Sequence, residues 1–178
     1  MTTLDNQAIT LEINLTIRLA AQADLPKLEW YGQYKHFRRL FRRTFNEQVR
    51  GRRWMLVADC NSFPIGQLFV QLNSGEQHLA DGSRRAYFYA LRVMEMFRGM
   101  GVGTHLITEA ESMLREGGFR WATIAAAKEN AGARRLYERL GYTVFAEDPG
   151  KWSYVDHTGT LQHVHEPCWI MEKKLPPR

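Results

Sequence analysis

Residues 97–106 read FRGMGVGTHL, a run in which glycines stand at every second position. These are Gly99, Gly101 and Gly103, and Arg98 comes directly before them. Glycine inside a helix or strand costs about 0.5–1 kcal/mol relative to alanine, so three glycines this close together indicate a local need for bare backbone. The run follows an apolar stretch at 86–93 that predicts a strand, and a helical pattern begins inside it.

A strand, a glycine turn and a helix N-terminus together predict an anion-binding site. The first N–H groups of a helix lack partners within the helix, and glycine lets phosphate oxygens approach them. Two common phosphate loops do not match this run. A nucleotide-hydrolase loop needs a lysine after its glycines, and none stands here. In the dinucleotide pattern G-x-G-x-x-G, the last position would be Thr104 or Leu106.

The periodicity on both sides of the run predicts alternating strands and helices. Before the run we expect a strand at 11–18, a helical region from Pro26 to about Gly51 with Asp24 as its N-cap, and a hairpin of strands at 54–59 and 64–72. After it we expect a helix from Val102 to Gly117, a strand at 121–127, a helix capped by Asn130 and ended by Gly141, and closing strands at 142–148 and 166–173. This order predicts a mixed α/β sheet with a crossover helix after the glycines.

Length and composition agree with a globular protein. The 178 residues contain no repeat or linker and predict one domain over 1–178, with 44% hydrophobic and 24% charged residues. The first ten residues lack a basic cluster followed by an apolar run, and no stretch is long enough to span a bilayer, so we expect no secretory signal and no membrane partner. Cys60 and Cys168 stand far apart, which favours reduced thiols and a cytoplasmic location.

The glycine run resembles the coenzyme A loop of the GNAT superfamily of acetyl-CoA-dependent N-acetyltransferases, whose pattern is [RQ]-x-x-G-x-[GA]. Leu91-Arg92-Val93 resembles the L-x-V that ends the preceding strand in that family. Downstream, the spacing N-x-x-A-x-x-L-Y-x-x-x-G-[FY] is met from Asn130 to Tyr142. The motifs cover the core 84–145. The resemblance implies an α/β (α+β) domain with a central mixed, mostly antiparallel sheet of about six to seven strands flanked by about four helices.

The resemblance implies acetyl-CoA as co-substrate and no metal. The cofactor-binding residues that it implies are Leu91, Val93, Arg98, Gly99, Met100, Gly101, Val102, Gly103, Thr104 and Asn130. The backbone at Leu91 and Val93 would pair with the pantetheine arm as an added strand. The chain departs from the family at Met94-Glu95, where a proline often follows the strand.

Direct acetyl transfer to an amine needs a neutral amine and a proton for the departing thiolate. A tyrosine hydroxyl can supply that proton, and by resemblance Tyr137 is the general acid. Its spacing also fits a core residue of an amphipathic helix. No general base is assigned. The sequence offers four residues for that role: Tyr89, Glu76, His78 and Asp156.

The acceptor is expected to be a primary amine of a small molecule or a peptide, and the sequence does not identify it further. Whether the protein forms a homodimer is also left open by the sequence. By resemblance the acceptor pocket lies between the first helical region and the last hairpin. Its candidate residues are Trp30, Tyr34, Tyr89, Trp152 and Tyr154. Trp30 and Tyr34 share a helical stripe with Phe37, and such a stripe is equally typical of a buried core.

Two other features were weighed. Residues 35–53 hold eight Lys or Arg and one acid, Glu47. This segment is typical of a solvated helix face, and nucleic acid is not expected as a partner, but the alternative function is a catalytically silent GNAT-like module that binds RNA or a protein there. His163, His165 and Cys168 lie close together, yet their spacing matches no common zinc site.

Overall fold

The computed structural model describes residues 12–177, and its centre is a seven-stranded sheet in the order β1-β2-β3-β4-β5-β9-β6. Every neighbouring pair is antiparallel except β4 and β5, which run parallel. The strands are β1 (Thr16–Leu19), β2 (Arg53–Cys60), β3 (Phe63–Gln71), β4 (Arg85–Val93), β5 (Trp121–Ala127), β6 (Thr143–Asp148) and β9 (Cys168–Lys174). The mixed, mostly antiparallel α/β fold expected from the sequence is confirmed.

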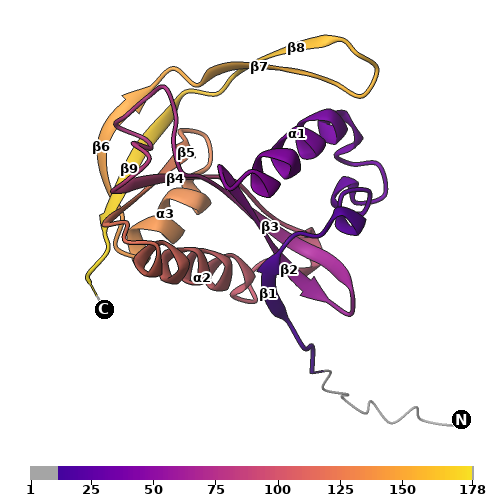
Figure 1. Ribbon diagram of the computed structural model, residues 1–178, viewed down its shortest axis with the longest axis horizontal. Helices are drawn as coiled ribbons and strands as arrows, with labels where there is room; N and C mark the ends of the chain where they lie inside the picture. Colours follow the sequence, from indigo (N-terminus) through magenta and orange to yellow (C-terminus); the bar gives the residue numbers. More distant parts are fainter. Residues whose placement is uncertain (1–11, 178) are drawn as a thin grey trace, which may run out of the picture.

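Helices cover both faces of the sheet (Figure 1). α2 and α3 lie on one face, and α1 lies on the other together with short 3-10 segments. The helices are α1 (Arg38–Val49), α2 (Val102–Glu116) and α3 (Ala131–Arg139), and the 3-10 segments are η1 (Gln22–Asp24), η2 (Lys27–Glu29), η3 (Lys35–Phe37) and η4 (Glu95–Phe97). Among the helices of residues 12–177, none has the length and apolar character needed to cross a membrane.

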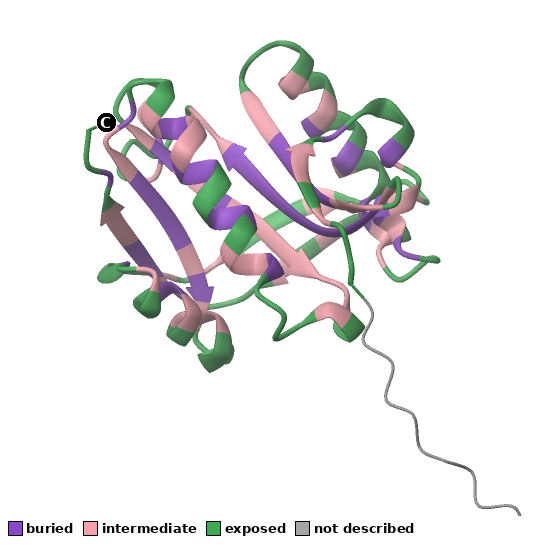
Figure 2. Ribbon diagram, turned by 90° about the horizontal axis from the view of Figure 1, so that it is seen from below, coloured by how far each residue is buried: buried purple, intermediate pink, exposed green. Residues whose placement is uncertain are grey.

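The alternation of side chains along the strands divides the core into two clusters. On the α2 and α3 face, strand residues such as Leu68 and Phe88 pack with Leu106. On the α1 face, Phe69 packs with Phe41. Figure 2 shows the buried residues running through the sheet and along the inner sides of the helices. The two clusters hold the central strands between two apolar layers, which explains why the middle residues of β2 and β3 are buried on both faces of the sheet.

Two expectations for the N-terminal part are corrected. β1 begins at Thr16 instead of residue 11, because its partner β2 ends at Cys60 and offers no backbone to pair with earlier residues. Leu11 itself lies outside the described residues. The helical region is broken before α1, because Trp30 and Tyr31 have positive φ angles of 42° and 58° that no α-helix accommodates.

Two strands between residues 148 and 166 were not among the predicted elements. β7 (Lys151–Val155) and β8 (Leu161–His165) follow β6 and precede β9 in the chain, and they form a separate two-stranded sheet. Asp156 closes its turn by accepting hydrogen bonds from the backbone N–H groups of Thr158 and Thr160. The sequence does contain a signal for this hairpin. Asp156 and Gly159 lie in a short polar segment between two runs that contain aromatic and aliphatic residues.

Candidate functional site

The central strands β4 and β5 separate halfway along their length. Their parallel pairing ends at Phe88 and Ile124. β4 continues to Val93 and stays paired with β3 on its other side, although the register shifts there and Ala90 has a φ of 53°. The last residues of β4 therefore present an edge toward β5 that no strand of residues 12–177 occupies, and an extended ligand can pair with such an edge.

The glycine run lies at the end of this open edge. Gly99 and Gly101 have φ angles of 76° and 85°, which favour glycine, and Gly101 is the N-cap of α2. The first intrahelical hydrogen bond around this turn runs from the His105 N–H to the Gly101 carbonyl. The N–H groups of the first turn, from Val102 onward, are thus available to an anion.

Gly103 needs a different explanation, because its φ is not positive. A Cβ atom there would lie 3.6 Å from Leu136 Cδ2 of α3, which is an ordinary contact. Neither backbone strain nor crowding therefore requires glycine at this position. Bare backbone here would let a ligand approach the first turn of α2 closely.

α3 carries the next two predicted residues. The side chain of Asn130 accepts a hydrogen bond from the Ala133 N–H at 3.0 Å, so the predicted cap is confirmed. Tyr137 is 5% exposed, and burial raises the pKa of its hydroxyl to about 12. Its hydroxyl makes no hydrogen bond with any residue of the described range 12–177. The hydroxyl therefore keeps its proton at neutral pH and has that proton free for a ligand.

Four of the five predicted acceptor residues meet on the α1 face of the sheet. Trp30 and Tyr34 make an edge contact at 5.3 Å, and Trp152 and Tyr154 of β7 lie 5.3 Å apart. Phe37 joins the two pairs, since its ring is 6.2 Å from Tyr34 and 4.9 Å from Tyr154. We call these five residues the aromatic cluster. The core interpretation also holds in part, because Trp30 and Phe37 are buried.

Tyr89, the fifth predicted acceptor residue, lies apart from the aromatic cluster. It contacts Phe69 at 5.6 Å, and its hydroxyl accepts a hydrogen bond from Arg53 Nη1 at 2.6 Å. Burial raises the pKa of this hydroxyl, and the neighbouring Arg53 opposes that shift. Tyr89 is therefore engaged by Arg53 and is a weak candidate for a base.

The other residues considered as bases are placed unfavourably. The Asp156 carboxylate accepts hydrogen bonds from Thr158, Thr160 and Gln162, which hold its pKa well below the usual range. Glu76 and His78 are exposed in the loop before β4, 3.7 Å from each other. A carboxylate with a depressed pKa is a poor proton acceptor, so Asp156 stabilises the hairpin turn instead.

His36 is a titratable residue that the sequence analysis missed. Its ring lies 4.2 Å from Phe37 and 6.1 Å from Tyr154. Burial lowers its pKa, the positive charge of Arg92 adds to that shift, and Asp156 opposes it. His36 is consequently neutral at pH 7, the protonation state that a base requires. Nothing in the local sequence signals this environment, since it arises from packing against the aromatic cluster.

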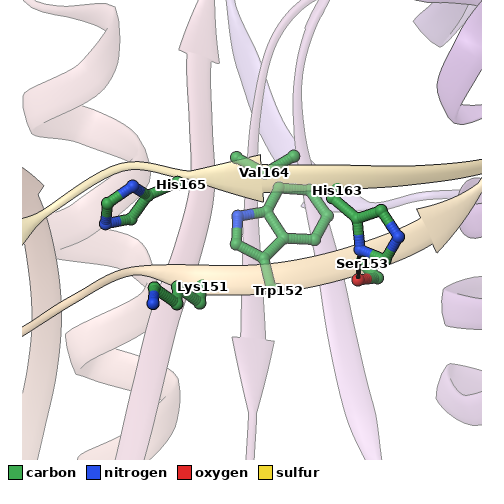
Figure 3. Close-up of a pocket in the computed structure, with 6 residues that line it drawn as sticks. All are labelled: Lys151, Trp152, Ser153, His163, Val164 and His165. Carbon is green, nitrogen blue, oxygen red and sulfur yellow. Dashed lines mark hydrogen bonds between the residues drawn. The ribbon is translucent and has the colours of Figure 1, made fainter.

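The β7–β8 hairpin carries a shallow pocket of about 320 Å³ on its own surface. Its walls are Lys151, Trp152, Ser153, His163, Val164 and His165 (Figure 3). Ser153 Oγ and His163 Nδ1 are 2.8 Å apart, so this histidine is engaged by a serine. Within the described residues, no three His, Cys, Asp or Glu side chains are placed to hold a metal.

The basic segment 35–53 is partly neutralised by acids. Arg38 pairs with Glu29 at 2.6 Å, and Arg53 pairs with Glu47. Arg39, Arg42 and Arg43 are exposed on α1. An exposed helix face with both paired and solvated arginines fits the structural interpretation of this segment.

Comparison with known proteins gives a coherent result. The model of the acetyltransferase (GNAT) family matches residues 20–142. Over 58 residues, 33% of this chain, the sequence is 38% identical to N-alpha-acetyltransferase MAK3 of Arabidopsis thaliana. The matched segment spans 30% of the length of that relative.

Solved structures resemble the whole fold. Ard1 from Thermoplasma volcanium matches with a TM-score of 0.70 at 19% identity, covering 91% of this chain and 98% of that one. Arabidopsis thaliana NAA60 in complex with acetyl-CoA matches with a TM-score of 0.66 at 19% identity, covering 91% and 99%. The ribosomal-protein-S18-alanine N-acetyltransferase from Escherichia coli matches with a TM-score of 0.66 at 18% identity, covering 93% and 96%. At these identities the likeness establishes the fold.

Proposed function

This chain belongs to the GNAT acetyltransferase family, and we propose that it transfers the acetyl group of acetyl-CoA directly to the α-amino group at the N-terminus of a peptide. The observation that carries the proposal is the open edge of β4 beside the glycine turn of α2. An extended arm can pair with the edge while a diphosphate is bound by the N–H groups of the helix.

The proposed cofactor site joins β4, the turn and α3. Leu91 and Val93 offer backbone to the pantetheine arm, and Asn130 caps the start of α3, which follows β5 in the chain. The diphosphate would lie on the turn and the first residues of α2, which comprise Arg98, Gly99, Met100, Gly101, Val102, Gly103 and Thr104. Acetyl-CoA supplies the activated acetyl group, and these residues hold and orient it.

Two features support a peptide acceptor. MAK3 is named an N-alpha-acetyltransferase, and the Escherichia coli structure is named for an alanine of a ribosomal protein. In this chain the aromatic cluster is built from residues 30–37, around η2 and η3, and from β7 of the β7–β8 hairpin, which extends over α1 (Figure 1). Rings that pack side by side from two separate elements can line an extended segment laid across them, and this suits a peptide better than a single small amine.

The proposed chemistry is one direct transfer. The neutral amine attacks the thioester carbonyl, the C–N bond forms, and the C–S bond breaks. The nitrogen releases a proton to solvent or to a neighbouring base, and Tyr137 donates its proton to the departing thiolate. The raised pKa keeps the Tyr137 hydroxyl protonated until the thiolate develops, and the tyrosinate left after the transfer recovers a proton from solvent before the next turnover.

A thiol-release assay tests the proposal. The purified protein is incubated with acetyl-CoA and either short peptides with free N-termini or small primary amines, and mass spectrometry locates the acetyl group. We expect peptide-dependent release of coenzyme A and acetylation at the N-terminal nitrogen. Absence of release with every amine, together with absence of a thermal shift with acetyl-CoA, would contradict the proposal. Release with small amines alone would contradict the peptide assignment.

A further inference from the structure

Arg92 is a half-buried arginine on the part of β4 that has separated from β5. It pairs with Gln67 of β3 and stands between Leu91 and Val93, whose backbone we assign to the cofactor. Leu91 and Val93 pack against the α2 and α3 face, and the alternation of the strand puts Arg92 on the α1 face. Its guanidinium carbon lies 4.9 Å from the ring centre of Tyr34 and 4.8 Å from that of Phe37.

Four arginines of the described residues stack on aromatic rings, and three of them also bind a carboxylate. Arg53 pairs with Glu47, Arg85 with Glu172 at 2.6 Å, and Arg134 with Glu138 at 2.8 Å. Within residues 12–177, the Arg92 guanidinium forms neither an ion pair nor a hydrogen bond. The acid that acts on it is Glu166, from the segment between β8 and β9, which influences it only by its charge.

This arrangement is costly without a ligand. A guanidinium partly withdrawn from water has fewer solvent acceptors for its N–H groups, and ring faces satisfy its charge only in part. Burial lowers the pKa of Arg92, which records the same cost, while Tyr34 and Glu166 oppose that shift. The two rings hold the planar group in one orientation, and a fixed fork of N–H donors matches a carboxylate.

We propose that Arg92 binds a carboxylate of the acceptor, so that the enzyme prefers acceptors with an acidic group close to the reactive amine. This inference rests on the proposed function, and it specifies the class of acceptor that the enzyme would prefer. In a peptide, the acidic group is an Asp or Glu side chain within the first residues. In a free amino acid, it is the α-carboxylate, and the experiment separates these two sources.

The experiment compares kcat/KM values for pairs of acceptors in the thiol-release assay. The first pair consists of two peptides with amidated C-termini. One carries Asp and Glu at positions two and three, and the other carries Asn and Gln there. The second pair is a free amino acid and its amide. For the wild-type protein we expect a preference for the acidic member of the first pair. A preference confined to the second pair would assign the carboxylate to a free amino acid.

Two variants tie the preference to Arg92. Arg92→Met keeps an apolar stem against Tyr34 and Phe37 but removes the charge, and the acidic-to-neutral ratio should fall about 10- to 100-fold. Arg92→Lys keeps the charge without the fork and should give an intermediate ratio. Arg42→Gln, on the exposed side of α1, is the matched control and should leave the ratio unchanged. Circular dichroism and acetyl-CoA binding report whether each variant is folded.

The outcomes separate the two proposals. Equal rates on acidic and neutral members of both pairs, with turnover intact, would overturn the role of Arg92 and leave the proposed function standing. A ratio that falls equally in Arg42→Gln would also overturn it, because long-range attraction would then explain the preference. No turnover with any acceptor would contradict the proposed function itself.

Discussion

The Nε atom of Arg98 donates a hydrogen bond to the backbone carbonyl of Val93 at 3.0 Å. The arginine that opens the glycine turn is thereby tied to the last residue of β4. This contact joins the edge proposed for the pantetheine arm to the turn proposed for the diphosphate. A single side chain therefore keeps the two halves of the proposed cofactor site in register.

Arg98→Ala should weaken acetyl-CoA binding. Loss of a charged donor typically costs about 1.5–3 kcal/mol, which corresponds to a dissociation constant about 10- to 100-fold higher. Isothermal titration with acetyl-CoA measures the change, and Arg52→Ala, on an exposed residue before β2, is the control. An unchanged dissociation constant in Arg98→Ala would show that the contact does not position the turn.

Gly101 and Gly103 should respond differently to alanine. Gly101→Ala forces a side chain into a left-handed conformation and should lower the free energy of unfolding by about 1–2 kcal/mol. Gly103→Ala makes only ordinary contacts, with Leu136 and Val93, and should leave that free energy unchanged or slightly higher, while acetyl-CoA affinity falls. Urea unfolding and titration of the same samples measure both quantities. Full affinity in Gly103→Ala would remove ligand approach as the reason for this glycine.

Tyr137→Phe should lower kcat about 100-fold or more while acetyl-CoA affinity is retained, because only the donated proton is lost. The pH profile gives a second test. The rate should rise with pH as the α-amine of the acceptor, with a pKa of about 7.7–8.0, loses its proton. The pKa of Tyr137 is raised to about 12, so its hydroxyl stays protonated across the assay range. A fall in kcat near pH 9 that disappears in Tyr137→Phe would contradict this assignment.

Glu111 should be important for stability and not for catalysis. It is 4% exposed, accepts a hydrogen bond from the Tyr142 hydroxyl at 2.9 Å, and pairs with Lys173 at 2.7 Å. Glu111→Ala leaves a half-buried ammonium and a buried hydroxyl without their partner and should cost about 3–5 kcal/mol. Thermal and urea unfolding measure the loss, and Glu109→Ala, on the exposed side of the same helix, is the control. A loss below that of the control would mean that solvent replaces the carboxylate.

The double variant Arg39→Ser, Arg43→Ser tests the alternative of a silent binding module. Both residues are exposed on α1, away from the glycine turn. We expect acetyl transfer to persist and the wild-type protein to bind no RNA in a gel-shift assay. RNA binding that is lost in the double variant, in a protein without transferase activity, would favour the binding module.

The sequence by itself was sufficient to predict the elements whose signals are local. The strand β5, the start of α2 and the Asn130 cap were found where they were expected, because periodicity and capping depend on neighbours a few residues apart. The glycine turn belongs to the same class. The positive φ angles at Gly99 and Gly101 depend on a few consecutive residues, so the glycines themselves predict them.

Tertiary structure alone decided the features that join distant segments. The length of β1 depends on where β2 ends, and the open edge of β4 depends on where β5 diverges from it. Arg92 meets Tyr34 and Phe37 although more than fifty positions separate them, and only the folded structure shows that its guanidinium has no carboxylate partner among residues 12–177. Packing between segments that are distant in the sequence determines how deeply a side chain is buried and which charges surround it. A local sequence pattern cannot predict either property.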